Sequence, residues 1–161
     1  MTDYNSNSPA PWADQADQIT AVVVEAGVTT VGGSSFKGCT NLTTVTLADG
    51  VEYIETAAFN GCTALSDITI PESVGYIKTG AFKDCTALTT VNIADGVEYI
   101  EAGAFNGCTA LTELNIPLSV GYIKTGAFKG CTALTSVTIR DDCRLDMNVF
   151  PDTVEVNYAE G

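Results

Sequence analysis

Six cysteines are the residues whose type and spacing first suggest chemistry in this chain of 161 residues, which contains no histidine. Five of them recur every 23 residues: Cys39, Cys62, Cys85, Cys108 and Cys131. Regularly spaced thiols are potential ligands for a soft metal ion or partners in disulfides. The absence of histidine removes the commonest general base, the Ser-His and Cys-His nucleophile pairs, and most zinc and iron sites.

Acidic residues also recur at one position of this 23-residue spacing. Asp49, Glu72, Asp95 and Asp141 occupy equivalent places, and Leu118 interrupts the series. Stacked carboxylates from successive loops could share a calcium ion, which prefers oxygen ligands. Solvated turn residues explain the same pattern with fewer requirements. We therefore predict no metal and no cofactor.

The whole chain is organised by a repeat of 23 residues, in which phenylalanine recurs at Phe36, Phe59, Phe82, Phe105 and Phe128. The template reads L-x-x-V-x-L-x-x-x-V-x-x-I-x-x-x-x-F-x-x-C. Its V-x-L part, with Thr-rich neighbours, predicts a short strand with one buried face. The part from the second valine to the cysteine predicts another short extended piece and a tight helical turn. One unit cannot bury its apolar face alone, so the fold must be a solenoid of stacked coils with parallel strands.

The solenoid decides between the interpretations of the cysteine row. Stacked coils lie about 4.8 Å apart, and their parallel Cβ vectors are wider apart than the roughly 3.8 Å that a disulfide needs. Each row cysteine also stands between a phenylalanine and a leucine that we expect to be buried. We therefore predict buried, reduced thiols in preference to a metal site or disulfides. Cys143 lies outside the row, and it is the thiol that we expect to be exposed if any is.

The two ends of the chain depart from the template. Residues 1–18 carry no repeat pattern and include Trp12, the single tryptophan, so we predict an N-terminal cap there. The repeat array is predicted over residues 19–140. Residues 141–161 fit the register poorly and predict a degenerate C-terminal repeat or cap, in which TVEVNY forms a closing strand.

Composition excludes several functions. The net charge of −13 repels polyphosphate and anionic lipid, so we expect no nucleic-acid partner. The apolar runs are short, so we expect no membrane insertion, and residues 1–20 show no export signal. Asp67 and Glu113 would lie two coils apart, about 10 Å, without a basic partner, which disfavours glycoside hydrolysis. We predict a monomer without enzymatic activity.

At this point the repeat resembles a known family. The pattern AFxxCTALTxVxI, followed by Pro or an Asp-Gly turn and then VxYI, is similar to the bacterial surface leucine-rich repeats of the BspA type, the Treponema pallidum class. The resemblance covers roughly residues 19–140. It implies a leucine-rich repeat solenoid with a parallel β-sheet on the concave side and short β and helical turns on the convex side. It also implies secretion or display at the cell surface, and adhesion to host proteins or other cells.

The outward positions of the strands are the candidate binding site. The core is uniform between repeats, so only surface positions can encode specificity. The predicted site residues on the concave face are Asp67, Thr69, Thr90, Asn92, Glu113 and Asn115.

The convex side carries two further files of residues. One alternates in charge and runs Glu55, Lys78, Glu101, Lys124. The other is Tyr53, Tyr76, Tyr99 and Tyr122. We interpret the charges as fixing the register and the tyrosines as covering the core, although a tyrosine stripe could also bind sugar or protein.

These observations lead to one functional hypothesis and one alternative. We expect a non-enzymatic leucine-rich repeat module that binds a protein or a glycan through its concave sheet. The alternative is a structural or engineered repeat scaffold with no ligand of its own.

Overall fold

Each 23-residue coil forms one long strand and one short strand in the computed structural model, which describes residues 3–5 and 7–160. Residues 1, 2 and 6 of the predicted cap and residue 161 lie outside this description. The long strands are β1 (Ala21–Val24), β3 (Thr44–Leu47), β5 (Asp67–Ile70), β7 (Thr90–Ile93), β9 (Glu113–Asn115), β11 (Ser136–Arg140) and β13 (Glu155–Ala159). The short strands are β2 (Thr30–Val31), β4 (Tyr53–Ile54), β6 (Tyr76–Ile77), β8 (Tyr99–Ile100), β10 (Tyr122–Ile123) and β12 (Arg144–Leu145).

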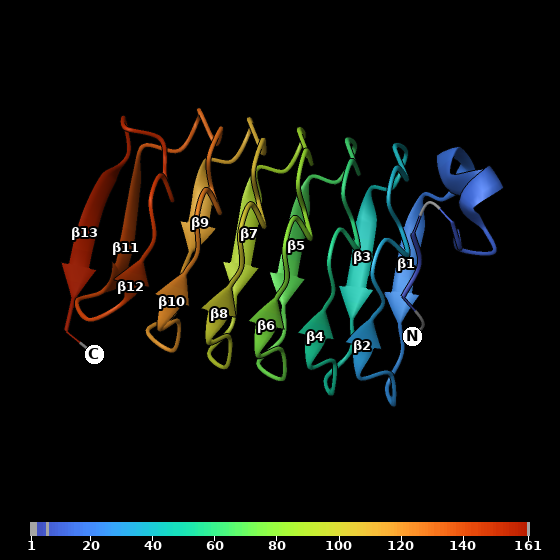
Figure 1. The fold of residues 1–161 in the computed structure, drawn as a ribbon, viewed down its shortest axis with the longest axis horizontal. Coiled ribbons are helices and arrows are strands. Elements are labelled where there is room, and N and C mark those ends of the chain that lie inside the picture. The colour runs from blue at the N-terminus through green and yellow to red at the C-terminus, as the bar shows by residue number, and fades with distance from the viewer. Residues whose placement is uncertain (1–2, 6, 161) are drawn as a thin grey trace.

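The coils stack side by side into a right-angled stack of strands along one axis, from β1 at one end to β13 at the other (Figure 1). All pairing between strands is parallel, and partners along the repeat array lie one coil apart, as in Tyr53 with Tyr76. In the last coil the offset falls to 22 residues, because Tyr122 pairs with Arg144. The predicted solenoid of parallel strands is confirmed.

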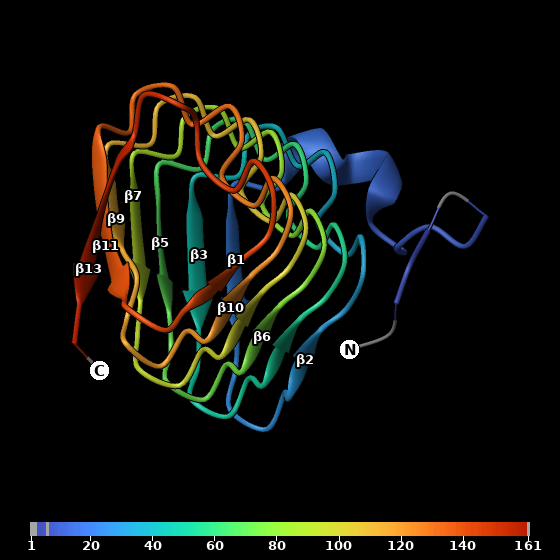
Figure 2. The ribbon, with the colours of Figure 1, turned by 60° about the vertical axis from the view of Figure 1, so that its left-hand side comes forward.

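Two separate faces result, which Figure 2 shows on either side of the coil. The short strands form one continuous six-stranded sheet in the order β12-β10-β8-β6-β4-β2, called here the short-strand face. The long strands form the long-strand face, which corresponds to the predicted concave sheet. Its hydrogen bonding falls into three blocks, β1-β3, β5-β7-β9 and β11-β13.

Between the two faces runs a column of aromatic rings. Phe59, Phe82, Phe105 and Phe128 are completely buried, and neighbouring rings stack with centroids 5.1 to 5.2 Å apart. Burial of one such ring in each coil supplies much of the hydrophobic stabilisation that a single coil lacks. Trp12 extends the column at one end, 5.7 Å from Phe36, and Phe150 extends it at the other, 5.3 Å from Phe128.

A series of tight turns leads each coil from the short strand back to the next long strand. Ala58 donates its amide to Glu55, Cys62 to Phe59, and Leu65 to Cys62, each across three residues. These turns do not continue into a helix within the coils that the structure describes. The predicted helical turn is therefore a chain of single turns, because each turn must place one buried side chain and then change direction.

The ends of the stack are closed by residues outside the regular template. A 3-10 helix, η1 (Ala13–Gln18), follows Trp12, whose indole Nε1 donates to the Ser35 carbonyl at 2.7 Å. At the other end β13 pairs with β11, as the closing strand predicted from TVEVNY requires. No helix in the described part of the chain has the length and apolar character needed to cross a membrane.

Candidate functional site

The six predicted site residues gather on three adjacent strands of the long-strand face. Register places Asp67 of β5 beside Thr90 of β7, and Thr90 beside Glu113 of β9. The second row is Thr69, Asn92 and Asn115 in the same order. We call this two-by-three arrangement the polar grid. It coincides with the central hydrogen-bonded block β5-β7-β9, so its backbone is held by strand pairing on both sides of β7.

The grid side chains face solvent and take little part in holding the fold. All are exposed except Thr90, which is half-buried. Asp67 accepts a hydrogen bond from the Ser66 hydroxyl at 2.8 Å, and Glu113 accepts one from Thr90 at 3.5 Å. The Asn115 amide donates to the Ile93 carbonyl at 3.4 Å. The grid therefore offers two carboxylates, two amides and two hydroxyls on one rigid surface.

The grid borders a groove that the sequence did not single out. The groove has a volume of about 590 Å³ and is lined by Glu72, Ile93, Ala94, Asp95, Asn115, Ile116, Pro117 and Leu118. Leu118 leaves 43% of its surface exposed at the position where other coils carry a carboxylate. The interruption of the acidic series by Leu118 was the signal in the sequence. It gives the edge of the grid an apolar patch.

The recurring carboxylates do not converge. In the described part of the chain, no group of three or more His, Cys, Asp or Glu side chains is placed to hold a metal ion. Asp49, Glu72, Asp95 and Asp141 are all exposed at the ends of their coils, as solvated turn residues are.

The row cysteines are free and buried, as predicted, and Cys143 is half-buried. Burial raises the pKa of Cys39 to about 11 and that of Cys131 to about 12. A thiol with so high a pKa is protonated at neutral pH and is a poor nucleophile or metal ligand. The row is thus part of the core.

The charge file on the short-strand face is centred on one carboxylate. Glu101 lies 3.6 Å from the Lys78 ammonium and 3.4 Å from that of Lys124. Burial acts to raise the pKa of Glu101, but the hydrogen bond from Thr79 and the two lysine charges outweigh it and lower that pKa. Glu55 forms no ion pair with any residue described in the structure.

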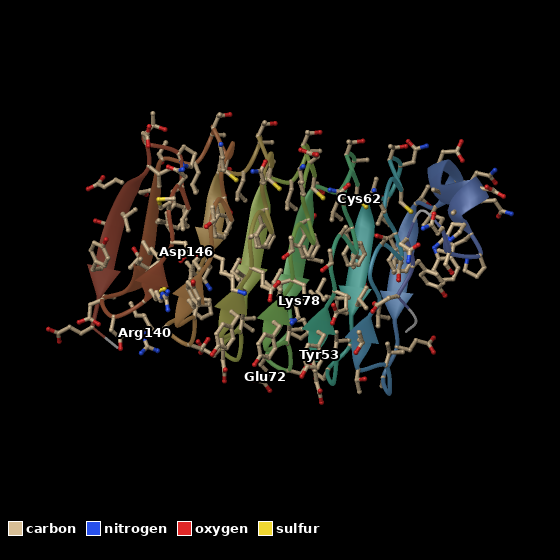
Figure 3. The ribbon with its side chains drawn as sticks, viewed as in Figure 1. Tyr53, Cys62, Glu72, Lys78, Arg140 and Asp146 are labelled. Atoms are coloured by element: carbon tan, nitrogen blue, oxygen red, sulfur yellow. The ribbon has the colours of Figure 1, made fainter. Side chains whose placement is uncertain are left out.

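The tyrosine file follows the same face, where Figure 3 labels Tyr53 and Lys78. Tyr53 stacks on Tyr76 at 5.4 Å, and Tyr76 stacks on Tyr99 at 5.0 Å. The Lys78 ammonium lies 4.9 Å from the centre of the Tyr76 ring. These rings are half-buried, in agreement with the interpretation that they cover the core.

Comparison with known proteins identifies the repeat. The family described as the BspA type Leucine rich repeat region matches residues 14–135 in 6 copies. No curated protein matches the chain.

Three solved structures are similar. A leucine-rich cell surface protein of Faecalibacterium prausnitzii is 30% identical, with a TM-score of 0.70, over 86% of this chain and 39% of that one. A leucine-rich repeat protein of Bacteroides ovatus is 27% identical, with a TM-score of 0.57, over 89% of this chain and 31% of that one. The leucine-rich repeat protein of T. pallidum is 28% identical, with a TM-score of 0.58, over 83% of this chain and 70% of that one.

This chain spans less than half the length of the first two of these proteins. The family match covers most of the chain, and it rests on the phenylalanine, cysteine and leucine positions that build the core described above. The chain belongs to the family of BspA-type leucine-rich repeat proteins.

Proposed function

We propose that this chain is a non-enzymatic recognition module that binds a protein or a glycan through the polar grid of its long-strand face. The observation that carries the proposal is the placement of the six grid residues in register on one hydrogen-bonded block. A flat, stiff sheet fixes its outward side chains before a partner arrives, and so lowers the entropy lost on binding.

Differences between coils support the grid as the place of specificity. The outward residues of β3 and β11 are Thr44, Thr46, Ser136 and Thr138, which are small and nearly uniform. The grid replaces these hydroxyls with carboxylates and amides, which can donate and accept hydrogen bonds in a defined pattern. The apolar Leu118 patch at its edge adds area that a partner can bury.

The absence of a catalytic arrangement in the grid supports binding without chemistry. Its carboxylates, Asp67 and Glu113, stand two strands apart with Thr90 between them. Neither has a nearby base or acid of shifted pKa, which an acid–base pair needs.

The setting proposed for this module is outside the bacterial cell, as a secreted or surface-displayed protein. The similar protein of Faecalibacterium prausnitzii is described as a cell surface protein. We propose a monomer that neither binds nucleic acid nor inserts into membranes, since a net charge of −13 disfavours both anionic partners and self-association.

A binding screen with paired variants tests this proposal. The parent is screened against immobilised extracellular matrix proteins and a glycan array. In the grid variant, Asp67, Asn92, Glu113 and Asn115 are all changed to alanine. We expect its affinity for a selected partner to fall by about tenfold or more, while its Tm changes by a few degrees at most.

The control variant changes Glu55, Lys78, Glu101 and Lys124 to alanine on the short-strand face. It should keep the affinity of the parent. A grid variant that binds as well as the parent, beside a control that does not, would move the site to the short-strand face. A parent that binds no probe would favour the alternative of a structural or engineered scaffold without its own ligand.

A further inference from the structure

The tyrosine column of the short-strand face changes character at its C-terminal end. Strand register aligns Tyr99, Tyr122 and Arg144 in successive coils, so an arginine stands where the next tyrosine would be. Stacking of the rings ends at Tyr99, since among the described residues no stacked pair joins Tyr99 to Tyr122. The Tyr122 hydroxyl instead donates to Asp146 at 2.8 Å. That bond holds the Tyr122 ring toward the last coil.

A groove opens where the two rings part. It has a volume of about 540 Å³ and is lined by Gly96, Glu98, Tyr99, Ser119, Gly121, Tyr122, Arg140 and Arg144. Figure 3 shows Arg140 and Asp146 at this C-terminal end of the face. We call it the arginine–tyrosine groove. Its volume lies in the range of about 300 to 1,000 Å³ that is usual for small-molecule sites.

Both arginines of the chain reach this groove, although the chain as a whole carries a net charge of −13. Arg140 is held in place, because it pairs with Asp142 and its Nη1 donates to the Leu118 carbonyl at 3.2 Å. Arg144 differs. Its guanidinium lies 4.6 Å from the centre of the Tyr122 ring, and it forms no ion pair with a described residue.

The carboxylate nearest to Arg144 along the chain is already engaged. Asp146 accepts hydrogen bonds from the Tyr122 hydroxyl and from the amide and hydroxyl of Thr125. The hydrogen bond from Tyr122 lowers the pKa of Asp146 and so keeps this carboxylate charged. Arg144 therefore presents a planar fork of donors, oriented by an aromatic ring, whose natural acceptor is a carboxylate from outside.

Glycines keep the floor of the groove bare. A Cβ at Gly96 would lie 1.9 Å from the Glu72 carbonyl oxygen, so no larger residue fits there. At Gly121 the space that a Cβ would occupy has nothing within 4 Å. The floor can therefore receive a flat ring at van der Waals distance. Glu98 is exposed at the wall and supplies an acceptor for hydroxyl groups.

From this arrangement we infer that the arginine–tyrosine groove binds an acidic sugar residue, a pyranose that carries one carboxylate. The carboxylate pairs with Arg144, the apolar face of the sugar ring lies against Tyr99 and Tyr122, and Glu98 accepts hydrogen bonds from ring hydroxyls. Aromatic faces, a charged donor and a carboxylate acceptor around a bare floor match the mixed apolar and polar surface of such a sugar.

An acidic peptide would also offer carboxylates, but the groove suits it less well. Strands β8 and β10 are paired on both sides within the sheet, so no free strand edge is present for a peptide backbone. Glu98 would also repel a second carboxylate at the wall.

The inference does not depend on the proposed function, since the groove lies on the short-strand face and the polar grid on the opposite one. The experiment is an NMR titration of the ¹⁵N-labelled full chain with four probes. These are methyl glucuronide, N-acetylneuraminic acid, methyl glucoside and a short peptide with two glutamates. We expect saturable shifts at Tyr99, Gly121 and Tyr122 with an acidic sugar, and an affinity for methyl glucoside weaker by about tenfold or more.

Two variants test the groove itself. Arg144→Ala removes the carboxylate partner, and Gly121→Leu fills the floor without a change of charge. Each should weaken binding of the acidic sugar by about tenfold or more. Lys83→Ala removes one exposed positive charge elsewhere and should leave binding within about twofold of the parent, as should the grid variant. Retained amide spectra establish that each variant is folded.

Four outcomes would overturn the inference. These are the absence of saturable shifts with both acidic sugars, equal affinity for methyl glucoside, unchanged binding by Arg144→Ala and Gly121→Leu, and equal weakening by Lys83→Ala, which indicates general charge attraction. Tighter binding of the peptide than of either sugar would also overturn it and assign the groove to acidic peptides. Loss of sugar binding in the grid variant alone would place the sugar on the long-strand face.

Discussion

Cysteine recurs in every coil because its thiol satisfies a backbone carbonyl of the preceding coil. Cys62 donates through Sγ to the Phe36 carbonyl at 3.2 Å, and Cys85 donates to that of Phe59 at the same distance. The same bond recurs from Cys108 and Cys131. A residue of similar size without a donor would leave these buried carbonyls with one partner fewer, at a cost that is small for each coil but repeated along the stack.

At the same scale, phenylalanine provides the strongest test of the core. Phe82 is completely buried, with Phe59 and Phe105 stacked 5.2 and 5.1 Å away on either side. Phe82→Ala leaves a ring-sized cavity between two rings, and we expect a loss of about 3 to 5 kcal/mol in the free energy of unfolding. Denaturant unfolding followed by circular dichroism measures the change.

Tyr158→Ala is the matched control, because Tyr158 is an aromatic residue with 63% of its surface exposed. It should change the free energy of unfolding by about 0.5 kcal/mol or less. Equal losses in the two variants would show that the stacked column does not stabilise the fold.

At the scale of the elements, the long strands are less uniform than the repeat suggests. No backbone hydrogen bond joins β3 to β5, or β9 to β11, in the part of the chain that the structure describes. The inward side chains of the strands at these borders, Val45, Leu47 and Leu114, are only half-buried, whereas Ile68 and Val91 are buried. The central block that carries the polar grid is therefore bounded by two weaker seams.

Amide hydrogen exchange tests these seams. The amides of Thr43, Thr89 and Thr112 donate to the preceding coil, to Thr20, Ser66 and Thr89 respectively. Those of Ser66 and Thr135, at the equivalent positions of their coils, form no such bond. Since unbonded amides exchange through small fluctuations, we expect Ser66 and Thr135 to exchange at least about tenfold faster than the other three. Equal protection at all five positions would mean that the sheet is continuous in solution.

At the scale of the whole molecule, the coils are linked along the short-strand face by charge as well as by packing. Glu101 accepts from Lys78 of the preceding coil and from Lys124 of the following one. In a chain with a net charge of −13, a carboxylate with two cationic neighbours is one of the few whose ionisation favours the folded state.

This arrangement predicts a particular dependence of stability on pH. The pKa of Glu101 is lower in the folded protein than its ordinary value of 4.5. The stabilisation is therefore present above that value and is lost as the pH falls through the folded pKa. Glu101→Gln should lower the Tm by a few degrees at pH 7, since each exposed pair contributes about 0.2 to 1 kcal/mol. The difference from the parent should close below about pH 4.

Glu55→Gln provides the control, because Glu55 occupies the same position two coils earlier without an ion pair in the described structure. It should leave the Tm unchanged or raise it slightly by removing one negative charge. Thermal melting of the parent and both variants at several pH values makes the comparison. A Tm difference for Glu101→Gln that persists at low pH would contradict the assigned role of its charge.

The repeat period by itself determined the solenoid, the buried phenylalanine and cysteine positions and the alignment of the grid residues. This was possible because residues one period apart must meet in adjacent coils, at a spacing set by the backbone. The closing strand β13 could be predicted for a similar reason, since the alternation in TVEVNY is local. The family resemblance rested on the same period and is confirmed by the match over residues 14–135.

Only the tertiary structure decided how neighbours in the same file choose between partners. Lys78 pairs with Glu101 and not with Glu55, and Tyr122 turns to Asp146 instead of stacking on Tyr99. The period makes both choices equivalent, so the outcome depends on side-chain rotamers and on the shorter last coil, which puts Arg144 beside Tyr122. The seams of the long-strand face and the arginine–tyrosine groove have the same origin. They arise from small displacements between coils that share one sequence pattern, and those displacements depend on packing across the whole stack.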